Sequence, residues 1–250
     1  MSLFCLVHGA NQGTWCWERL IPELEARGHQ AITMDLPIDE PSTSLSNYAD
    51  VVIQSLQDVD DQVILVGHSM AGMIIPLVAM QRPIRKLMFL CALLPQIGMS
   101  GLDQFYDEVD PNRLKEVGYK PPLASLFEQL SDEPNMYNPA SLTKKQVSQD
   151  ETIAKEICFH DCEPDVAHWA ISKLRDMRSL SHLTEVFPLQ TLPNVECDYI
   201  VCMDDRIISP TWSKYAARKR LKVEAIELPG GHYPHISHPI QLAEVLTKST

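Results

Sequence analysis

Short apolar runs alternate with helix-like patterns along the first 95 residues of the chain. Leu3–Val7 is a continuous apolar run, which is typical of a strand buried on both faces of a parallel sheet. Apolar residues then recur at helical spacing over 17–24, and Gly28 stands where a helix would take its left-handed stop. The same alternation predicts a strand at 30–34, a helix at 45–59, a strand at 63–66, a helix from about 70 and a strand at 86–91. Because strands separated by single helices are joined by right-handed crossovers, the pattern predicts a parallel sheet.

The alternation stops after Pro95. Between residues 96 and 190 the pattern predicts short helices and no convincing strand, at LDQFYDEVD (102–110), LASLFEQL (123–130), DETIAKEICF (150–159) and DVAHWAISKLR (165–175). Strand character returns at 198–203 and 223–228, with a helix between these strands and an amphipathic helix at the end of the chain. We therefore expect an α/β fold whose core is formed by residues 1–95 and 191–250, with a helical cap inserted at 96–190.

Composition narrows the class of protein. With 250 residues, of which 45% are hydrophobic, the chain can bury a sizeable core, and an α/β chain of this length is commonly one domain. It carries 21 basic and 33 acidic residues, a formal net charge of -12, and its longest basic run is the triplet Arg218-Lys219-Arg220. This balance disfavours nucleic acid and anionic membranes as partners.

Cysteine usage and the apolar stretches bear on the compartment. The seven cysteines are odd in number and mostly lie among apolar residues, which favours reduced thiols over a disulfide framework. No signal peptide is recognisable at the amino terminus, and the apolar stretches Met73–Met80 and Leu87–Leu94 are too short for a membrane-spanning helix. We expect a cytoplasmic protein; the sequence leaves the oligomeric state open, and a homodimer is compatible with it.

A serine with small neighbours stands where the third predicted strand meets a helix. Gly67-His68-Ser69-Met70-Ala71 matches the nucleophile elbow Gly-x-Ser-x-Gly, with alanine in the last position. In this elbow a sharp turn exposes the serine, and helix and strand approach so closely that larger side chains would collide. Since the strand before and the helix after are the context that the motif requires, Ser69 is a candidate nucleophile.

The first predicted strand ends in LVHGANQG. A carbonyl attacked by Ser69 becomes a tetrahedral oxyanion, which needs preorganised hydrogen-bond donors. The usual pair is the backbone N–H after the nucleophile and one from the loop after an earlier strand, and here Met70 and Ala10 would supply them. We interpret His8, in the same loop, as a structural histidine.

An acid and a base follow the last two predicted strands. Asp204 and Asp205 stand in IVCMDDRIISP just past a strand end, and His232 lies in the Gly-rich loop of ELPGGHYPHISHP. Either carboxylate could serve as the acid at the level of chemistry. The chain order serine, acid, histidine is that of α/β-hydrolases and differs from both the chymotrypsin and the subtilisin order.

With these motifs the chain resembles the α/β-hydrolase superfamily. The similarity is greatest to the methylesterase and hydroxynitrile lyase branch, typified by plant methyl salicylate esterases, and to bacterial esterase relatives. It runs through the segments VHGANQGTWCWERLIPELEARGHQAITMDLP, VGHSMAGM, YIVCMDDRIISP and GGHYPHISHP, and it is weak in the predicted cap.

The resemblance implies a fold and a set of roles. The fold would be a mostly parallel sheet of about six strands flanked by helices, because the two strands that open larger members would be absent. By motif, Ser69 would be the nucleophile, His232 the base and Asp205, the second of the acidic pair, its orienting acid. The backbone amides of Ala10 and Met70 would form the oxyanion hole.

The same resemblance separates two reaction types. In the cyanohydrin-cleaving plant members a threonine follows the first-strand histidine, and a lysine follows the catalytic histidine; this chain has Gly9 and Tyr233 there. The threonine hydroxyl helps to hold the cyanohydrin oxygen, and the lysine offers positive charge to departing cyanide. Ester hydrolysis needs neither, so the two residues favour an esterase.

Other clusters of polar residues have simpler explanations. His232, His235 and His238 are spaced by threes, but Pro234 and Pro239 disfavour a regular helix with one histidine face. No acidic or cysteine ligand is close in sequence, so we expect no metal site and no cofactor.

Several aromatic and apolar side chains are candidates for pocket walls or for ordinary core. Trp17 fits the apolar stripe of the first helix, whereas Trp15 could stand at a pocket entrance. In the predicted cap the candidates for an apolar lid are Phe105, Leu126, Phe127, Phe159 and Trp169. Amphipathic helices bury such residues in any case, so the sequence does not assign them to a pocket.

Three classes of function fit the sequence. The leading hypothesis is a serine carboxylesterase, with a methylesterase as its narrower form, that cleaves small esters with an apolar part through an acyl-enzyme. The second is carbon-carbon bond cleavage, as in hydroxynitrile lyases. The third is a non-catalytic receptor for a small molecule, because fold does not fix function.

Overall fold

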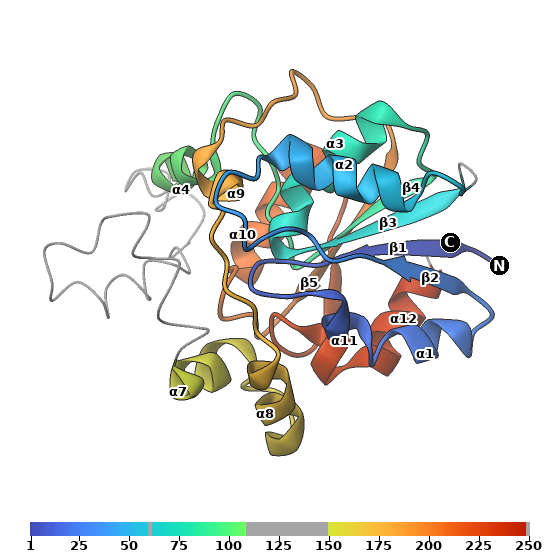
Figure 1. Ribbon diagram of the computed structural model, residues 1–250, viewed down its shortest axis with the longest axis vertical. Coiled ribbons are helices and arrows are strands. Elements are labelled where there is room, and N and C mark those ends of the chain that lie inside the picture. The colour runs from blue at the N-terminus through green and yellow to red at the C-terminus, as the bar shows by residue number, and fades with distance from the viewer. Residues whose placement is uncertain (60–61, 109–149, 249–250) are drawn as a thin grey trace, which may run out of the picture.

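The computed structural model describes residues 1–59, 62–108 and 150–248, which contain one six-stranded sheet (Figure 1). The strands are β1 (Leu3–Val7), β2 (Gln30–Thr33), β3 (Val63–His68), β4 (Lys86–Leu90), β5 (Glu196–Cys202) and β6 (Ile226–Leu228). Their order is β2-β1-β3-β4-β5-β6, and each neighbouring pair is parallel. The prediction of a parallel sheet of about six strands is therefore confirmed.

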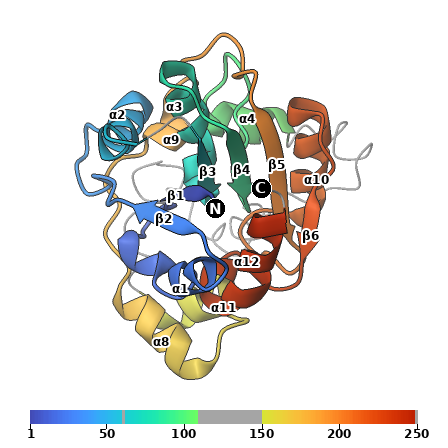
Figure 2. The ribbon, with the colours of Figure 1, turned by 90° about the vertical axis from the view of Figure 1, so that its right-hand side faces the viewer.

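Helices cover both faces of the sheet. They are α1 (Ile21–Glu25), α2 (Leu45–Ser55), α3 (Ile75–Gln81), α4 (Gly101–Glu108), α7 (Glu151–Ile153), α8 (Pro164–Ser172), α9 (Ser181–Thr184), α10 (Pro210–Ala216), α11 (Pro234–Ser237) and α12 (Pro239–Lys248). Helices α1, α11 and α12 lie on one face, and α2, α3 and α10 lie on the other (Figure 2). Each face therefore has its own apolar cluster, and the central strands β3 and β4 are buried along their whole length, as apolar runs in a parallel sheet require.

Two helix starts differ from the expected positions, and in both a proline lies in the first turn. The helix expected over 17–24 is a 3-10 turn at Thr14–Trp17 followed by α1, with Pro22 near its start. The helix expected from about 70 begins as a 3-10 turn at Ser69–Met73, and α3 follows with Pro76 in its first turn. Proline lacks the N–H that an inner turn would need, so it fits only where a helix begins.

The described part of the predicted cap contains short helices and no strand. Helix α4, α7 with a π-helical turn (Ala154–Cys158), and α8 overlap the expected segments 102–110, 150–159 and 165–175. Residues 109–110 and the whole of 123–130 lie outside the described residues. These helices and α9 lie on the side of the molecule toward which the carboxyl ends of the strands point (Figure 1). The division into a core at 1–95 and 191–250 and a cap at 96–190 stays a prediction. Among the described helices none is both long and apolar enough to span a membrane.

Candidate active site

Ser69 occupies a strained turn at the end of β3. Its φ is 53°, in the left-handed region that residues with a side chain seldom adopt, and its carbonyl accepts a 3.0 Å hydrogen bond from the Leu93 N–H. A Cβ on Gly67 would lie 3.0 Å from the Ala71 carbonyl oxygen, and one on Gly72 would lie only 2.0 Å from that of Leu93. The elbow thus excludes side chains at 67 and 72, while the alanine at 71 fits fully buried.

His232 and Asp205 form a buried pair at the same edge of the sheet. His232 lies in the loop between β6 and α11, and its Nδ1 donates a 2.7 Å hydrogen bond to Oδ2 of Asp205, which follows β5. Asp205 Oδ1 accepts from the N–H groups of Ile207 and Ile208 at 2.7 and 2.9 Å. Because the carboxylate fixes the proton on Nδ1, Nε2 carries the lone pair, and it has no hydrogen-bond partner among the described residues.

The neighbouring carboxylate faces elsewhere. Asp204 is exposed, and its Oδ2 lies 3.4 Å from the N–H of Gly230. Its own N–H donates to the Gly230 carbonyl at 3.0 Å. Asp204 therefore closes a turn between two loops, and of the acidic pair only Asp205 contacts the His232 ring.

The loop after β1 lies directly against the elbow. A Cβ on Gly9 would come within 2.9 Å of both Ser69 Cβ and His68 Nδ1, so only glycine lets the loop approach this closely. Ala10 follows in this loop. Met70 is the second residue of the 3-10 turn, where a backbone N–H has no acceptor inside the turn. The Met70 amide thus belongs to the residue after Ser69, and Ala10 belongs to the loop that packs against Ser69.

Hydrogen bonds of Asn11 and His8 also hold the loop after β1. Asn11 has φ 59°, a conformation that asparagine tolerates better than most residues. Its side-chain amide donates to the Arg175 carbonyl at 3.0 Å, and the Arg175 N–H donates back to the Asn11 carbonyl at 2.8 Å. His8 donates from Nδ1 to the Gly9 carbonyl at 2.8 Å and accepts from the Leu36 N–H at 2.9 Å, so both ring nitrogens bond to the backbone.

One cluster of potential metal ligands includes two of the residues above. Ligand atoms of Cys91, Asp205 and His232 lie within 4.8 Å of one another, a set that motif spacing in the sequence did not indicate. Burial raises the pKa of the Cys91 thiol well above its ordinary value, which disfavours the thiolate that a metal requires. His232 Nδ1 and Asp205 are also engaged with each other. The hydrogen-bonded pair thus accounts for the cluster without a metal.

The described aromatic candidates are buried or half-buried. Trp17 is fully buried, as expected, and Trp15 is half-buried with its ring edge-on to Trp169 at 5.5 Å. Phe159 is buried 4.8 Å from the Tyr233 ring, next to the loop that carries His232. The Phe105 side chain, Leu126 and Phe127 lie outside what the structure describes.

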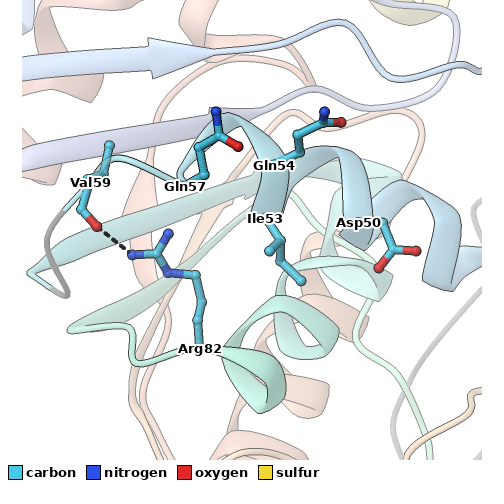
Figure 3. A pocket seen from close by; sticks show the side chains of 6 residues that line it. All are labelled: Asp50, Ile53, Gln54, Gln57, Val59 and Arg82. Carbon is cyan, nitrogen blue, oxygen red and sulfur yellow. Dashed lines mark hydrogen bonds between the residues drawn. The ribbon is translucent and has the colours of Figure 1, made fainter.

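A surface hollow of about 630 Å³ lies at the opposite edge of the sheet (Figure 3). It is lined by Asp50, Ile53, Gln54, Gln57, Val59 and Arg82. Arg82 donates to the carbonyls of Leu56 and Val59, so its guanidinium caps the chain after α2. None of the sequence-predicted site residues lies in this hollow.

Comparison with known proteins identifies similar sequences and structures. Residues 6–245 match the model of the Alpha/beta hydrolase family. The chain is 28% identical to Salicylic acid-binding protein 2 of Nicotiana tabacum, over 97% of this chain and 95% of that protein. Among solved structures, a pyrethroid hydrolase from Sphingobium faniae JZ-2 has a TM-score of 0.74 at 22% identity, covering 99% of this chain and 96% of that one.

A methylesterase from Arabidopsis has a similar structure as well. Its TM-score is 0.68 at 18% identity, and the match covers 100% of this chain and 98% of that one. At such identities the two structural matches show a shared fold.

Proposed function

The chain belongs to the alpha/beta hydrolase family. We propose that it is a serine carboxylesterase acting on small esters with an apolar acyl or alcohol part. One observation carries the proposal: a serine in left-handed backbone and a buried, hydrogen-bonded Asp205–His232 pair, on loops at one edge of the sheet. Hydrolases and methylesterases among its relatives support the reaction class, with methyl esters as the narrower form.

The first half of the reaction acylates Ser69. His232 Nε2 accepts the proton of the Ser69 hydroxyl as its oxygen attacks the ester carbonyl, and Asp205 stabilises the imidazolium that forms. The carbonyl oxygen becomes an oxyanion, to which the N–H groups of Ala10 and Met70 donate. When the tetrahedral intermediate collapses, the bond to the alcohol breaks and His232 returns its proton to the leaving oxygen.

The second half uses water in place of the serine hydroxyl. His232 accepts a proton from water, whose oxygen attacks the acyl carbon and forms a second oxyanion at the same donors. Collapse breaks the bond to Ser69 Oγ, which takes the proton from His232, and releases the carboxylic acid. Each group ends the cycle in its starting state.

The structure gives physical reasons to favour this chemistry over cyanohydrin cleavage. A Cβ at position 9 would collide with Ser69, so no side-chain hydroxyl can stand there in this backbone. Burial raises the pKa of the Tyr233 hydroxyl well above its ordinary value, so the residue after His232 is neutral and offers no positive charge to cyanide.

A panel of p-nitrophenyl and methyl esters of increasing acyl length tests the proposal. We expect hydrolysis of the short esters, and a loss of at least about a thousandfold in Ser69→Ala at unchanged unfolding free energy, because the attacking atom is removed. Mandelonitrile should release no cyanide above the uncatalysed rate. Residual ester turnover within tenfold of the parent would exclude Ser69 as the nucleophile.

Two other outcomes would select the alternatives. Cyanide release that disappears in Ser69→Ala, without hydrolysis of any ester, would identify a lyase. If a fluorophosphonate failed to label Ser69 in the folded protein, the site would be a binding site and not an esterase.

A further inference from the structure

A buried polar cluster lies beside the proposed triad and has no part in the reaction described above. It consists of the side chains of Gln12, His68 and His235, and we call it the Gln12 cluster. The three side chains are at most 1% exposed. The His68 ring lies 4.8 Å from the His232 ring and 4.5 Å from that of His235.

The Gln12 carboxamide joins three segments of the chain. Its Oε1 accepts a 2.9 Å hydrogen bond from the Gly9 N–H, one residue before Ala10, and also lies 2.9 Å from His68 Nδ1. Its Nε2 lies 3.1 Å from His235 Nε2. The loop after β1, the elbow and the loop of the catalytic histidine thus meet at one side chain.

His68 continues these contacts to the backbone of His232. Its Nε2 lies 2.8 Å from the His232 carbonyl oxygen, which can only accept a hydrogen bond. The cluster therefore contacts the His8–Gly9 peptide, one before the peptide of the Ala10 N–H, on one side and the backbone of the proposed base on the other.

The hydrogen bonds of the His68 ring and of the Gly9 N–H cannot all be satisfied while the ring is neutral. Both neighbours of the His68 ring, Gln12 Oε1 and the His232 carbonyl, are acceptors, but a neutral imidazole has one N–H. Turning the Gln12 amide over would satisfy His68 but would face its NH₂ toward the Gly9 N–H. In the first arrangement one contact of His68 lacks a proton unless the ring carries two, and in the second the Gly9 N–H lacks an acceptor.

The surroundings of His68 disfavour that second proton. Burial, with His235 and His232 nearby, lowers the pKa of His68 well below its ordinary value. His8 forms a contrast, because its neutral ring finds one acceptor and one donor in the backbone. Buried polar groups are usually fully paired, and a shortfall beside a reactive site indicates a functional constraint.

We propose that Gln12 and His68 are positioning residues, which hold the Ala10 amide and His232 in the geometry needed at the transition state. Gln12 fixes the His8–Gly9 peptide, to which the peptide of the Ala10 N–H is directly joined, while His68 ties the Gln12 carboxamide to the His232 backbone. The inference rests on the proposed serine-esterase function, since it assigns these groups to the donors and base of that reaction.

The substitution Gln12→Met tests this role, because it keeps the length of the side chain and removes its hydrogen bonds. The readouts are the rate at which a fluorophosphonate labels Ser69 and the separate kcat and KM for a short p-nitrophenyl ester. We expect labelling and kcat to fall about tenfold or more, with KM within about threefold, because a misplaced donor acts mainly in the transition state.

Two variants serve as controls. Arg82→Met also removes side-chain hydrogen bonds to the backbone, but at the opposite edge of the sheet, and should lower stability without slowing labelling per folded molecule. Gln12→Glu keeps acceptors for the Gly9 N–H, for a doubly protonated His68 and for His235 Nε2–H, so labelling should stay within about threefold of the parent.

A ¹⁵N spectrum of the histidine rings gives a second measurement, also informative if Gln12→Met does not fold. At pH 7 His68 should carry one ring proton in the parent and two in Gln12→Glu. The proposal is overturned if Ser69 in Gln12→Met is labelled at a rate within threefold of the parent. It is also overturned if Arg82→Met or Gln12→Glu slows labelling as much as Gln12→Met does, or if His68 stays neutral in Gln12→Glu. Absence of labelling in the parent would instead refute the esterase function.

Discussion

Asp204 and Asp205 show how two identical side chains acquire different chemistry from their immediate surroundings. Asp205 accepts three hydrogen bonds, two from backbone N–H groups and one from His232, and its side chain is 2% exposed. Asp204 is exposed and bonds to Gly230 at a strand-end turn. The difference arises from the direction of the backbone after β5.

The two carboxylates should therefore respond differently to the same change. Asp205→Asn should lower kcat/KM for ester hydrolysis by at least about a thousandfold, because an amide can neither hold the proton on His232 Nδ1 nor stabilise the imidazolium. Asp204→Asn should stay within about threefold. Steady-state kinetics of the two variants measure the contrast, and a larger loss in Asp204→Asn would reverse our assignment of the acid.

At this scale the sequence predicts motifs better than contacts. Ser69, Ala10 and His232 could be selected because each stands at a recognisable position after a predicted strand. The choice between the two aspartates needed the family pattern, since the deciding donors are backbone groups of Ile207 and Ile208. Gln12 gave no signal, because a glutamine in a polar loop looks like a surface residue until its burial is known.

Among the elements, the turn between the π-helical turn and α8 contacts the loop that carries His232. Asp161 in this turn accepts a 2.7 Å hydrogen bond from the Gly231 N–H through Oδ2, which also lies 3.4 Å from His238 Nδ1. Its Oδ1 is buried without a hydrogen-bond partner in the described part of the chain. Glycine at 231 leaves room for this contact, because a Cβ there would lie 2.9 Å from Asp161 Oδ1.

We predict that Asp161 fixes the position of the His232 loop. Asp161→Ala should lower the free energy of unfolding by about 2 kcal/mol, because a buried N–H loses a charged acceptor. It should also lower kcat by about tenfold, since the base is held less firmly. Urea unfolding and ester kinetics measure the two effects.

Two variants separate this contact from a general effect of the cap segment. Asp161→Asn keeps an acceptor for the Gly231 N–H and should recover most of kcat. Asp165→Ala changes an exposed acid at the start of α8 and should alter neither quantity. An unchanged kcat in Asp161→Ala would show that the His232 loop holds its position without this contact.

Element boundaries were less predictable than element types. Strands β1 and β4 were placed within one residue because they are continuous apolar runs. The helices after β1 and β3 start later than expected, since tight 3-10 turns bring the chain back over the sheet edge before Pro22 and Pro76 admit a helix. Periodicity alone cannot separate such turns from the helix that follows.

At the scale of the whole molecule, the alternation of strands and helices was sufficient to predict the sheet. The burial of polar residues in the protein, by contrast, was not predictable from the sequence. Besides His232, four histidines are at most 7% exposed: His8, His68, His182 and His235. Burial lowers the pKa of His8 and of His182 to about 4, and it lowers the pKa of His68 and His235 well below the ordinary value. All four are therefore neutral in the folded protein near pH 7.

The lowered pKa values of these four histidines make the free energy of unfolding depend on pH. In the unfolded chain these histidines bind a proton near pH 6.5, whereas in the folded protein they bind it only at a lower pH. Unfolding therefore takes up protons below pH 6.5, and the free energy of unfolding must fall as the pH decreases. For His8 and His182 the loss is complete below about pH 4.

Removing one of these histidines should flatten the dependence of stability on pH. When the pH is lowered from 7 to 5, the free energy of unfolding should fall by about 2 kcal/mol less in His182→Leu than in the parent. This difference is the contribution of one histidine whose pKa is 6.5 in the unfolded chain and about 4 in the folded protein. Urea unfolding at a series of pH values measures this difference. Leu183→Ala, in the same helix α9, should lower stability equally at every pH, since no titrating group is removed. If the parent and His182→Leu gave parallel curves, His182 would be protonated to the same extent in the folded and unfolded chains, contrary to its burial.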